Sequence, residues 1–419
     1  MKRVIATIVL VVLFTTTIAA QTFNLSAELR PRYENKHGYK TLQPTDADGS
    51  NFISQRTRLN FGFKNEKLKA YVSMQNVRVW GDVSTLSAND NATALHEAWA
   101  EATLSNKLSL KLGRQEIVYD DHRIFGSVGW AQQARSHDAF IFKYLPDAKN
   151  RLDVGFALNS DSQSGADNLY SNAAGYKTFQ YAWYHGNFDT FGLSFLLLNT
   201  GIEYEDADAE QTVDYVQTIG PRFTYKKDKL DANAAVYFQT GKTVDTDVSA
   251  LYYAANLGYK LNDNFKVGLG YEYLSGKDQD DTDVEINTFA PMFGTNHKFN
   301  GWMDYFYVGF GNPTGLTDIS ATIAYKKDKF SMKLIPHFFS TAGDVFDIDG
   351  KMDANLGTEI DFTLGYKIAK DIKLSAGYSK MFGTDTMEAI KGGDKDENNS
   401  WGWIMFTFKP NLFSHTVAK

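Results

Sequence analysis

Apolar and polar residues alternate with a period of two along almost the whole chain beyond residue 20. In the segment FKVGLGYEY, residues 265–273, the odd positions are aromatic or aliphatic, whereas the even positions are Lys, Gly, Gly and Glu. The segment NLGTEIDFTLGY, residues 355–366, repeats this pattern. Alternation predicts β-strands with one apolar and one polar face, and a helical period of 3.6 is almost missing. The chain is therefore predicted to be all-β.

The predicted strands are long, and the connections between them alternate in kind. Many strands run for about 10 to 14 residues, which exceeds the usual 5 or 6 and is enough to cross a bilayer at a tilt of about 45°. Tight charged turns are expected at 64–67, 105–107, 146–150, 186–189, 226–229, 261–264, 326–329 and 367–371. Longer polar loops are expected at 35–51, 81–93, 117–128, 161–175, 200–209, 241–247, 276–313, 342–352 and 384–397.

Eight short turns interleaved with nine long loops join about eighteen antiparallel strands, with both chain ends on the short-turn side. This arrangement predicts a transmembrane antiparallel β-barrel with short periplasmic turns and long extracellular loops. Closure leaves no strand edge unpaired in lipid. A soluble β-sandwich or propeller is the alternative, but it would not require the long strands or the alternation of turns and loops.

Both ends of the chain carry signals of export to the bacterial outer membrane. A basic start, an apolar run over 4–14 and small residues up to residue 20 predict a signal peptide over 1–20, and the run is too short to span a membrane. The barrel is expected to occupy 21–419. The aromatic alternation of WGWIMFTFKPNLF, residues 401–413, is typical of a closing strand read by the outer-membrane assembly machinery.

Composition narrows the function further. The chain has no cysteine, so an exported protein of 419 residues must be stable without disulfides. A net charge of −7 argues against nucleic-acid binding. We expect no cofactor, and we expect a monomer surrounded by outer-membrane lipid, because no separate interface patch stands out from the lipid-facing surface.

Strand alternation assigns the residues that point into the lumen. The predicted inward basic residues are Arg30, Arg32, Arg56, Arg58, Arg222, Lys333 and His337. The predicted inward acidic residues are Glu28, Glu97, Glu101, Glu272, Glu359 and Asp361. Arginines on neighbouring strands repel one another unless acids or ligands compensate them. They are therefore expected to attract anions or to orient polar solutes in a water-filled pore, with internal ion pairing as the alternative.

The sequence gives less support to two other chemistries, which are catalysis and calcium binding. His96 and His185 are placed on the outward face as interfacial residues, so no nucleophile and base pair is expected and the protein is predicted not to be an enzyme. A surface adhesin or a barrel enzyme that uses the long loops remains the alternative function. The spacing of Asp347, Asp349 and Asp353 resembles a calcium loop, although no complete EF-hand loop is present.

Three stretches resemble the alginate export family of outer-membrane porins. They are QNVRVWGD (75–82), LKLGRQEIVYDDHRIFGSVGWAQQARSHDAFIFKY (110–144) and FAPMFGTNHKFNGWMDYF (289–306). The resemblance implies an eighteen-stranded barrel that exports an anionic polyuronate, an arginine-rich constriction, and a long loop at the pore mouth, here 276–313. The candidate pore residues that it implies are Arg78, Arg114, Gln115, Arg135, Asp138, His297 and Lys298.

The acidic overall composition departs from what a strongly anion-selective exporter would have. The prediction is therefore a channel in which polar or anionic saccharides, or similar small solutes, diffuse passively through an arginine-lined lumen.

Overall fold

The computed structural model describes residues 20–87, 89, 92–163, 170, 175–307 and 313–417. The predicted signal peptide lies outside the described residues, except for residue 20. The first strands are β1 (Gln21–His37), β2 (Ser50–Lys64), β3 (Leu68–Val79), β4 (Thr93–Thr103), β5 (Leu108–Gln115), β6 (His137–Tyr144), β7 (Asn150–Leu158), β8 (Thr178–Phe188), β9 (Phe191–Glu205) and β10 (Gln211–Lys227). The remaining barrel strands are β11 (Leu230–Thr243), β12 (Thr246–Lys260), β13 (Phe265–Leu274), β14 (Leu316–Lys327), β15 (Phe330–Ser340), β18 (Asn355–Ala369), β19 (Ile372–Gly383), β20 (Ser400–Phe408) and β21 (Asn411–Val417).

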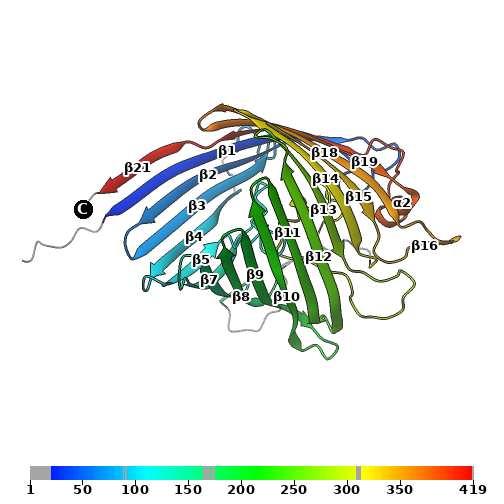
Figure 1. Cartoon of the computed structure of the whole chain (residues 1–419), viewed down its shortest axis with the longest axis horizontal. Helices are drawn as coiled ribbons and strands as arrows, with labels where there is room; N and C mark the ends of the chain where they lie inside the picture. The colour runs from blue at the N-terminus through cyan, green and yellow to red at the C-terminus, as the bar shows by residue number, and fades with distance from the viewer. Residues whose placement is uncertain are drawn as a thin grey trace, which may run out of the picture.

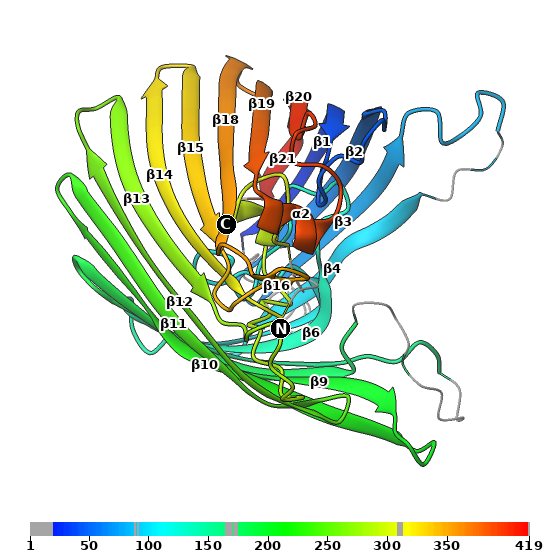
Figure 2. The ribbon, with the colours of Figure 1, turned by 90° about the vertical axis from the view of Figure 1, so that its right-hand side faces the viewer.

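Each barrel strand pairs with its neighbour in antiparallel register, and the ring closes on β1 (Figures 1 and 2). On one side β1 pairs with β2, and on the other side it pairs with both β20 and β21. The break between β20 and β21 falls at Pro410, which has no N–H to donate. Its carbonyl still accepts from the Ala27 N–H at 3.1 Å, so β20 and β21 act as one strand. The predicted barrel of eighteen strands is confirmed.

Short turns gather at one end of the barrel, and the longer connections lie at the other end. The two Lys-Lys-Asp-Lys segments form equivalent hairpin turns, in which Asp228 and Asp328 take left-handed φ angles of 51° and 50°. The prediction of a long loop at 241–247 is wrong. There β11 and β12 meet in a two-residue turn, with Val244 at φ 48° and Asp245 at φ 60°, as a type I′ turn requires.

Two connections fold into the barrel. We call residues 116–136, between β5 and β6, inner loop A, and the described residues 275–307, after β13, inner loop B. Inner loop B contains the short 3₁₀ helix η1 (Asn296–Lys298). Phe125 of inner loop A and Phe293 of inner loop B stack with ring centroids 5.4 Å apart, and both are buried. The hydrophobic core therefore lies inside the ring of strands, where coil is visible in Figure 2.

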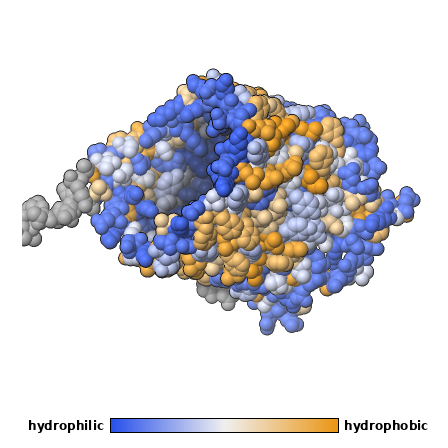
Figure 3. All heavy atoms as spheres, viewed as in Figure 1, coloured by the Kyte–Doolittle hydropathy of each residue, from blue (hydrophilic) through white to orange (hydrophobic). Residues whose placement is uncertain are grey.

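Apolar side chains cover much of the outer face of the barrel. Phe23, Leu59, Leu269 and Ile404 are exposed there, as expected for strands that meet lipid. Figure 3 shows apolar patches beside a hollow that hydrophilic residues line. The longer loops carry the hairpin β16 (Phe346–Asp347) and β17 (Gly350–Lys351) and the helix α2 (Asp385–Lys391). Within the described residues, no helix has the length and hydrophobicity needed to cross a bilayer.

Candidate functional site

The arginines of β1 and β2 bind the backbone of inner loop A. Arg30 Nη1 donates to the Gly129 carbonyl at 2.8 Å, and Nη2 donates to the carbonyls of Trp130 at 3.0 Å and Ala131 at 3.1 Å. Arg30 Nε donates to Gln132 Oε1 at 3.0 Å. Each hydrogen bond to a charged group contributes about 1.5 to 3 kcal/mol. The guanidinium group of Arg30 therefore attaches inner loop A to the barrel wall inside the lumen.

Arg32 and Arg56 extend this attachment. Arg32 lies over the Trp130 ring at 4.2 Å and donates to the Trp130 carbonyl at 2.8 Å. Arg56 donates to the Gln132 carbonyl at 3.3 Å and pairs with Glu28 at 2.5 Å.

The sequence-based prediction that these arginines line the pore needs correction. Arg30, Arg32 and Arg56 do point inward, but they are only 4 to 7% exposed because inner loop A covers them. Glu28 is likewise buried, between Arg56 and Lys409.

The water-filled space inside the barrel is lined by charged residues other than Arg30, Arg32 and Arg56. A cavity of about 500 Å³ lies between strands β10 to β15 and the inner loops. Its charged lining contains Asp121, Asp231, Glu272 and Asp318 together with Arg222, Lys266, Lys298, Lys333 and His337. Of these, Arg222, Glu272, Asp318 and His337 are buried. Arg222 Nη1 pairs with Asp121 at 2.7 Å, and Lys266 pairs with Asp231 at 2.6 Å.

Two ammonium groups in this cavity have no carboxylate partner in the part of the chain that the structure describes. Lys298 Nζ donates to the Asp121 carbonyl at 2.8 Å, and Lys333 Nζ lies 5.9 Å from the centre of the Trp302 ring. Neither makes an ion pair within the described part of the chain. Burial lowers the pKa of Lys298 on η1, and the positive charge of Arg222 lowers it further, against the opposite effect of Asp121.

Several predicted pore acids hold inner loop B instead of facing water. Glu359 accepts from the Met303 N–H at 2.8 Å, and Asp361 accepts from the Trp302 N–H at 3.2 Å. Both carboxylates are completely buried, so their prediction as pore-lining residues is wrong.

Glu272 and His337 are also buried beside inner loop B. Glu272 pairs at 3.0 Å with Arg123, a buried residue of inner loop A. His337 pairs with Asp318 at 2.9 Å. Elsewhere in the wall, Glu101 bridges Lys69 and Lys143 at 3.1 and 2.6 Å.

The family-motif residues divide between the outer face and the inner loops. Arg78, Arg114 and Asp138 have the strand parity of exposed, lipid-side neighbours such as Met74, Leu112 and Phe140, so their inward placement is wrong. Arg114 pairs with Asp138 at 2.7 Å on that side.

Of the other motif residues, Arg135 and His297 connect the two inner loops to each other, whereas Gln115 lies in the wall. Arg135 donates to the Gly294 carbonyl at 3.0 Å, which joins inner loop A to inner loop B. His297 stacks on Trp130 with centroids 5.1 Å apart. Gln115 is buried and donates to the Ala139 carbonyl at 2.8 Å.

Both histidines that were predicted to face outward lie inside the barrel. His96 is 4% exposed, and its Nε2 lies 2.8 Å from Glu116 Oε1. His185 Nδ1 lies 2.9 Å from Ser194 Oγ. The prediction from the sequence did not include this Ser and His pair. The Ser194 hydroxyl, however, donates to Asp120 at 2.5 Å, so the imidazole must donate to the serine and cannot take its proton.

The aspartates with calcium-like spacing do not converge. Asp347 Oδ1 accepts from the backbone N–H groups of Asp349 and Gly350 at 2.8 and 3.0 Å. Asp353 accepts from the Asn355 N–H. Among the described residues, the carboxylates of Asp347, Asp349 and Asp353 do not come close enough to share one ion.

The fold and the polar lumen define an outer-membrane β-barrel channel. The alginate export family model matches residues 21–402, so the chain belongs to the alginate export family. A comparison with curated proteins finds no match.

Solved structures with the same fold are outer-membrane porins. OccAB4 of Acinetobacter baumannii has a TM-score of 0.62 at 12% identity, over 96% of this chain and 99% of that chain. OccK9 (OpdG) of Pseudomonas aeruginosa has a TM-score of 0.61 at 12% identity, over 94% and 98%. A BenF-like porin from Pseudomonas fluorescens Pf-5 has a TM-score of 0.60 at 13% identity, over 93% and 99%. The family and these neighbours are channels rather than enzymes, and they place the protein in the bacterial outer membrane.

Proposed function

We propose that the protein lets polar, anionic saccharides cross the outer membrane by passive diffusion. The observation that carries this proposal is the pair Lys298 and Lys333, whose ammonium groups line the lumen cavity without a carboxylate partner among the described residues. An unpaired cation beside water attracts solute carboxylates, and it releases them easily because it binds them at a single point.

The neutral lining of the same cavity suits a hydroxylated solute. Asn233, Asn256, Ser320 and Thr322 line it beside the lysines. Amide and hydroxyl groups donate and accept hydrogen bonds, as sugar hydroxyls do. Fixed charges of both signs also lie there, because Arg222 of the wall forms an ion pair with Asp121 of inner loop A. We therefore expect a polar solute to replace its bound water molecules one by one with hydrogen bonds to the groups that line the cavity.

Ion selectivity tests the electrostatic part of the proposal. The purified protein is inserted into planar bilayers, and the reversal potential is measured across a potassium chloride gradient. We expect an anion preference that falls in the double variant Lys298→Gln/Lys333→Gln. The double variant Lys227→Gln/Lys327→Gln removes the same charge from exposed turns and serves as the matched control. A cation preference in the wild type, or equal selectivity in both double variants, contradicts the proposal.

A liposome uptake assay tests the saccharide part. Galacturonate and galactose have nearly the same size and differ by one carboxylate. We expect galacturonate to enter faster than galactose through the wild type, and the two rates to converge in Lys298→Gln/Lys333→Gln. Equal rates through the wild type would exclude selection for anionic saccharides while leaving channel activity itself intact.

A further inference from the structure

A β-bulge in β4 turns two consecutive side chains toward the lumen. The β3 and β4 ladder pairs Ser73 with Glu97 and Met74 with Leu95, so His96 is the extra residue. A bulge changes the direction of the side chain it inserts and is a specific feature of a strand. Without it, strict alternation would send His96 into lipid next to an inward Glu97. The bulge instead places an imidazole and a carboxylate side by side.

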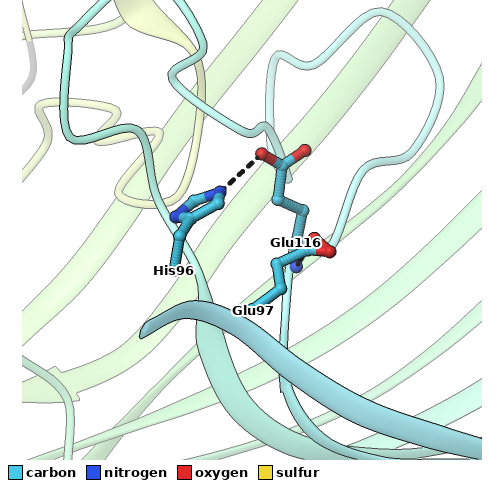
Figure 4. Close-up of side chains that lie close together, drawn as sticks. All are labelled: His96, Glu97 and Glu116. Carbon is cyan, nitrogen blue, oxygen red and sulfur yellow. Dashed lines mark hydrogen bonds and ion pairs between the residues drawn. The ribbon is translucent and has the colours of Figure 1, made fainter. Parts of the chain in front are cut away.

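Inner loop A adds a second carboxylate to the pair. Glu116 is the first residue after β5, and its backbone N–H donates to Glu97 Oε1 at 3.4 Å. Its own carboxylate lies 2.8 Å from His96 Nε2 (Figure 4). One ligand atom each from His96, Glu97 and Glu116 can be chosen so that all lie within 4.8 Å of one another. Figure 4 shows the imidazole directed at the Glu116 carboxylate, with Glu97 beside them.

We propose that His96, Glu97 and Glu116 bind a divalent transition-metal ion of the zinc class in the lumen wall. One imidazole nitrogen with two carboxylate oxygens suits zinc better than calcium or magnesium, which prefer oxygen ligands alone. Ligand atoms around tetrahedral zinc lie about 3.4 Å apart, which follows from bond lengths near 2.1 Å. The Glu116 side chain is 31% exposed and so has room to rotate toward that spacing.

The surroundings of the three ligands support a metal site. The Trp99 indole N–H donates to Glu97 Oε2 at 3.0 Å and so orients the carboxylate, as groups behind metal ligands usually do. Three protein ligands leave a fourth tetrahedral position open, and an adjacent cavity of about 300 Å³ is lined by all three of them.

An unsatisfied donor lies beside the same cavity. Arg58 lines it, and the Arg58 Nη2 group is buried without a hydrogen-bond partner among the described residues. A buried donor without a partner is costly, so a ligand is expected to satisfy it. The nearby ammonium of Lys409 is already paired with Glu28 at 2.7 Å. An anionic oxygen in the open metal position would accept from Arg58 and complete the site.

Direct binding of zinc tests this inference without reference to transport. The full-length mature protein, purified without a histidine tag, is titrated with Zn²⁺ by calorimetry in detergent. Co²⁺ is then added in place of Zn²⁺, because its visible absorption reports tetrahedral coordination. We expect one ion per chain and a tetrahedral cobalt spectrum. His96→Gln should weaken binding at least tenfold.

The controls separate a specific site from scattered surface binding. His415→Gln removes an exposed histidine of β21 and should leave the affinity within twofold of the wild type. Glu116→Gln keeps the side-chain size at a position outside the strands and should weaken binding at least fivefold without affecting the fold. Folding of each variant is checked by the heat-dependent shift of its band in gel electrophoresis. Wild-type binding that both His96→Gln and Glu116→Gln retain, or no tetrahedral spectrum, overturns the proposal.

Discussion

Arg30 of β1 and Gln132 of inner loop A form hydrogen bonds in both directions, so that each residue donates to the other. Arg30 Nε and Nη2 donate to Gln132 Oε1 at 3.0 and 2.9 Å, and Gln132 Nε2 donates back to the Arg30 carbonyl at 3.3 Å. Both residues are buried. A side chain that binds both the guanidinium and the backbone of its partner fixes position and orientation together. The wall and the inner loop therefore behave as one rigid unit at this point.

Removing this attachment should loosen inner loop A rather than change ion selectivity. In Arg30→Gln/Arg32→Gln, the carbonyls of residues 129–131 lose their charged donors, at about 1.5 to 3 kcal/mol for each bond. We expect new proteinase K cleavage within 116–136, located by mass spectrometry, and larger, noisier single-channel currents. Lys227→Gln is the control. A variant with a protected loop and reduced anion preference would show that these arginines act on solutes instead.

One buried guanidinium contributes several of the polar contacts between the two inner loops. Arg123 pairs with Glu272 and donates to Asn296 and Asn300 at 3.2 and 2.9 Å. Arg123→Gln leaves the Glu272 carboxylate buried without its counter-ion, which costs about 3 to 5 kcal/mol. We expect both inner loops to become sensitive to protease together. Protection of 275–307 with cleavage confined to 116–136 would argue that the loops pack independently.

Gly113 of β5 should not tolerate a side chain. Its φ is 114°, and an added Cβ would lie 2.3 Å from the Ala98 carbonyl oxygen. Gly113→Ala is expected to destabilise the barrel by about 2 kcal/mol or more. Gly62→Ala is the matched control, because the nearest atom to its Cβ would be 3.8 Å away. Urea unfolding in detergent compares the two, and equal midpoints would contradict the expected strain.

Stability should rise in alkaline solution because of one lysine. Burial lowers the pKa of Lys391 on α2 from its ordinary 10.5 to about 8. Between these values the unfolded chain binds the proton and the folded chain does not, so stability rises with pH. Lys391→Met should lose this gain.

The pH effect is measured as a difference between two proteins, so that other titrating groups cancel. From pH 7.5 to pH 10, the thermal midpoint of the wild type should rise relative to that of Lys391→Met by about 2 °C. Lys227→Met provides a second comparison, and it should follow the wild type. A constant difference between wild type and Lys391→Met across this range would contradict the assigned cause.

The order of the strands and the face to which each strand residue points could be predicted from the sequence, because both depend on local alternation of polar and apolar residues. Each inward or outward position in β1 and β2 follows from its neighbours two residues away. The inner loops could not be predicted in this way. The contact between Arg30 and Gly129 joins residues 99 positions apart, and parity shows only that Arg30 points inward. Whether a loop or water meets the guanidinium depends on packing that alternation does not encode.

The errors at His96 and Arg114 have different causes. The bulge at His96 breaks the parity on which its outward placement rested. The Arg114 prediction failed because the family motif was read as a set of pore residues, whereas alternation across β4 and β5 puts Arg114 outside. For Arg135, in contrast, the motif did identify a residue inside the lumen, although the partner it binds is a loop carbonyl.

Unequal strand lengths shape the entrance to the channel. At about 3.4 Å per residue, the 17 residues of β10 extend roughly 58 Å, whereas the 8 residues of β5 and of β6 extend roughly 27 Å. The rim is therefore lower where inner loop A begins and ends than it is at β10, four strands along the ring from β6. A solute that approaches from the long-loop end meets an oblique mouth and can enter sideways over the low flank.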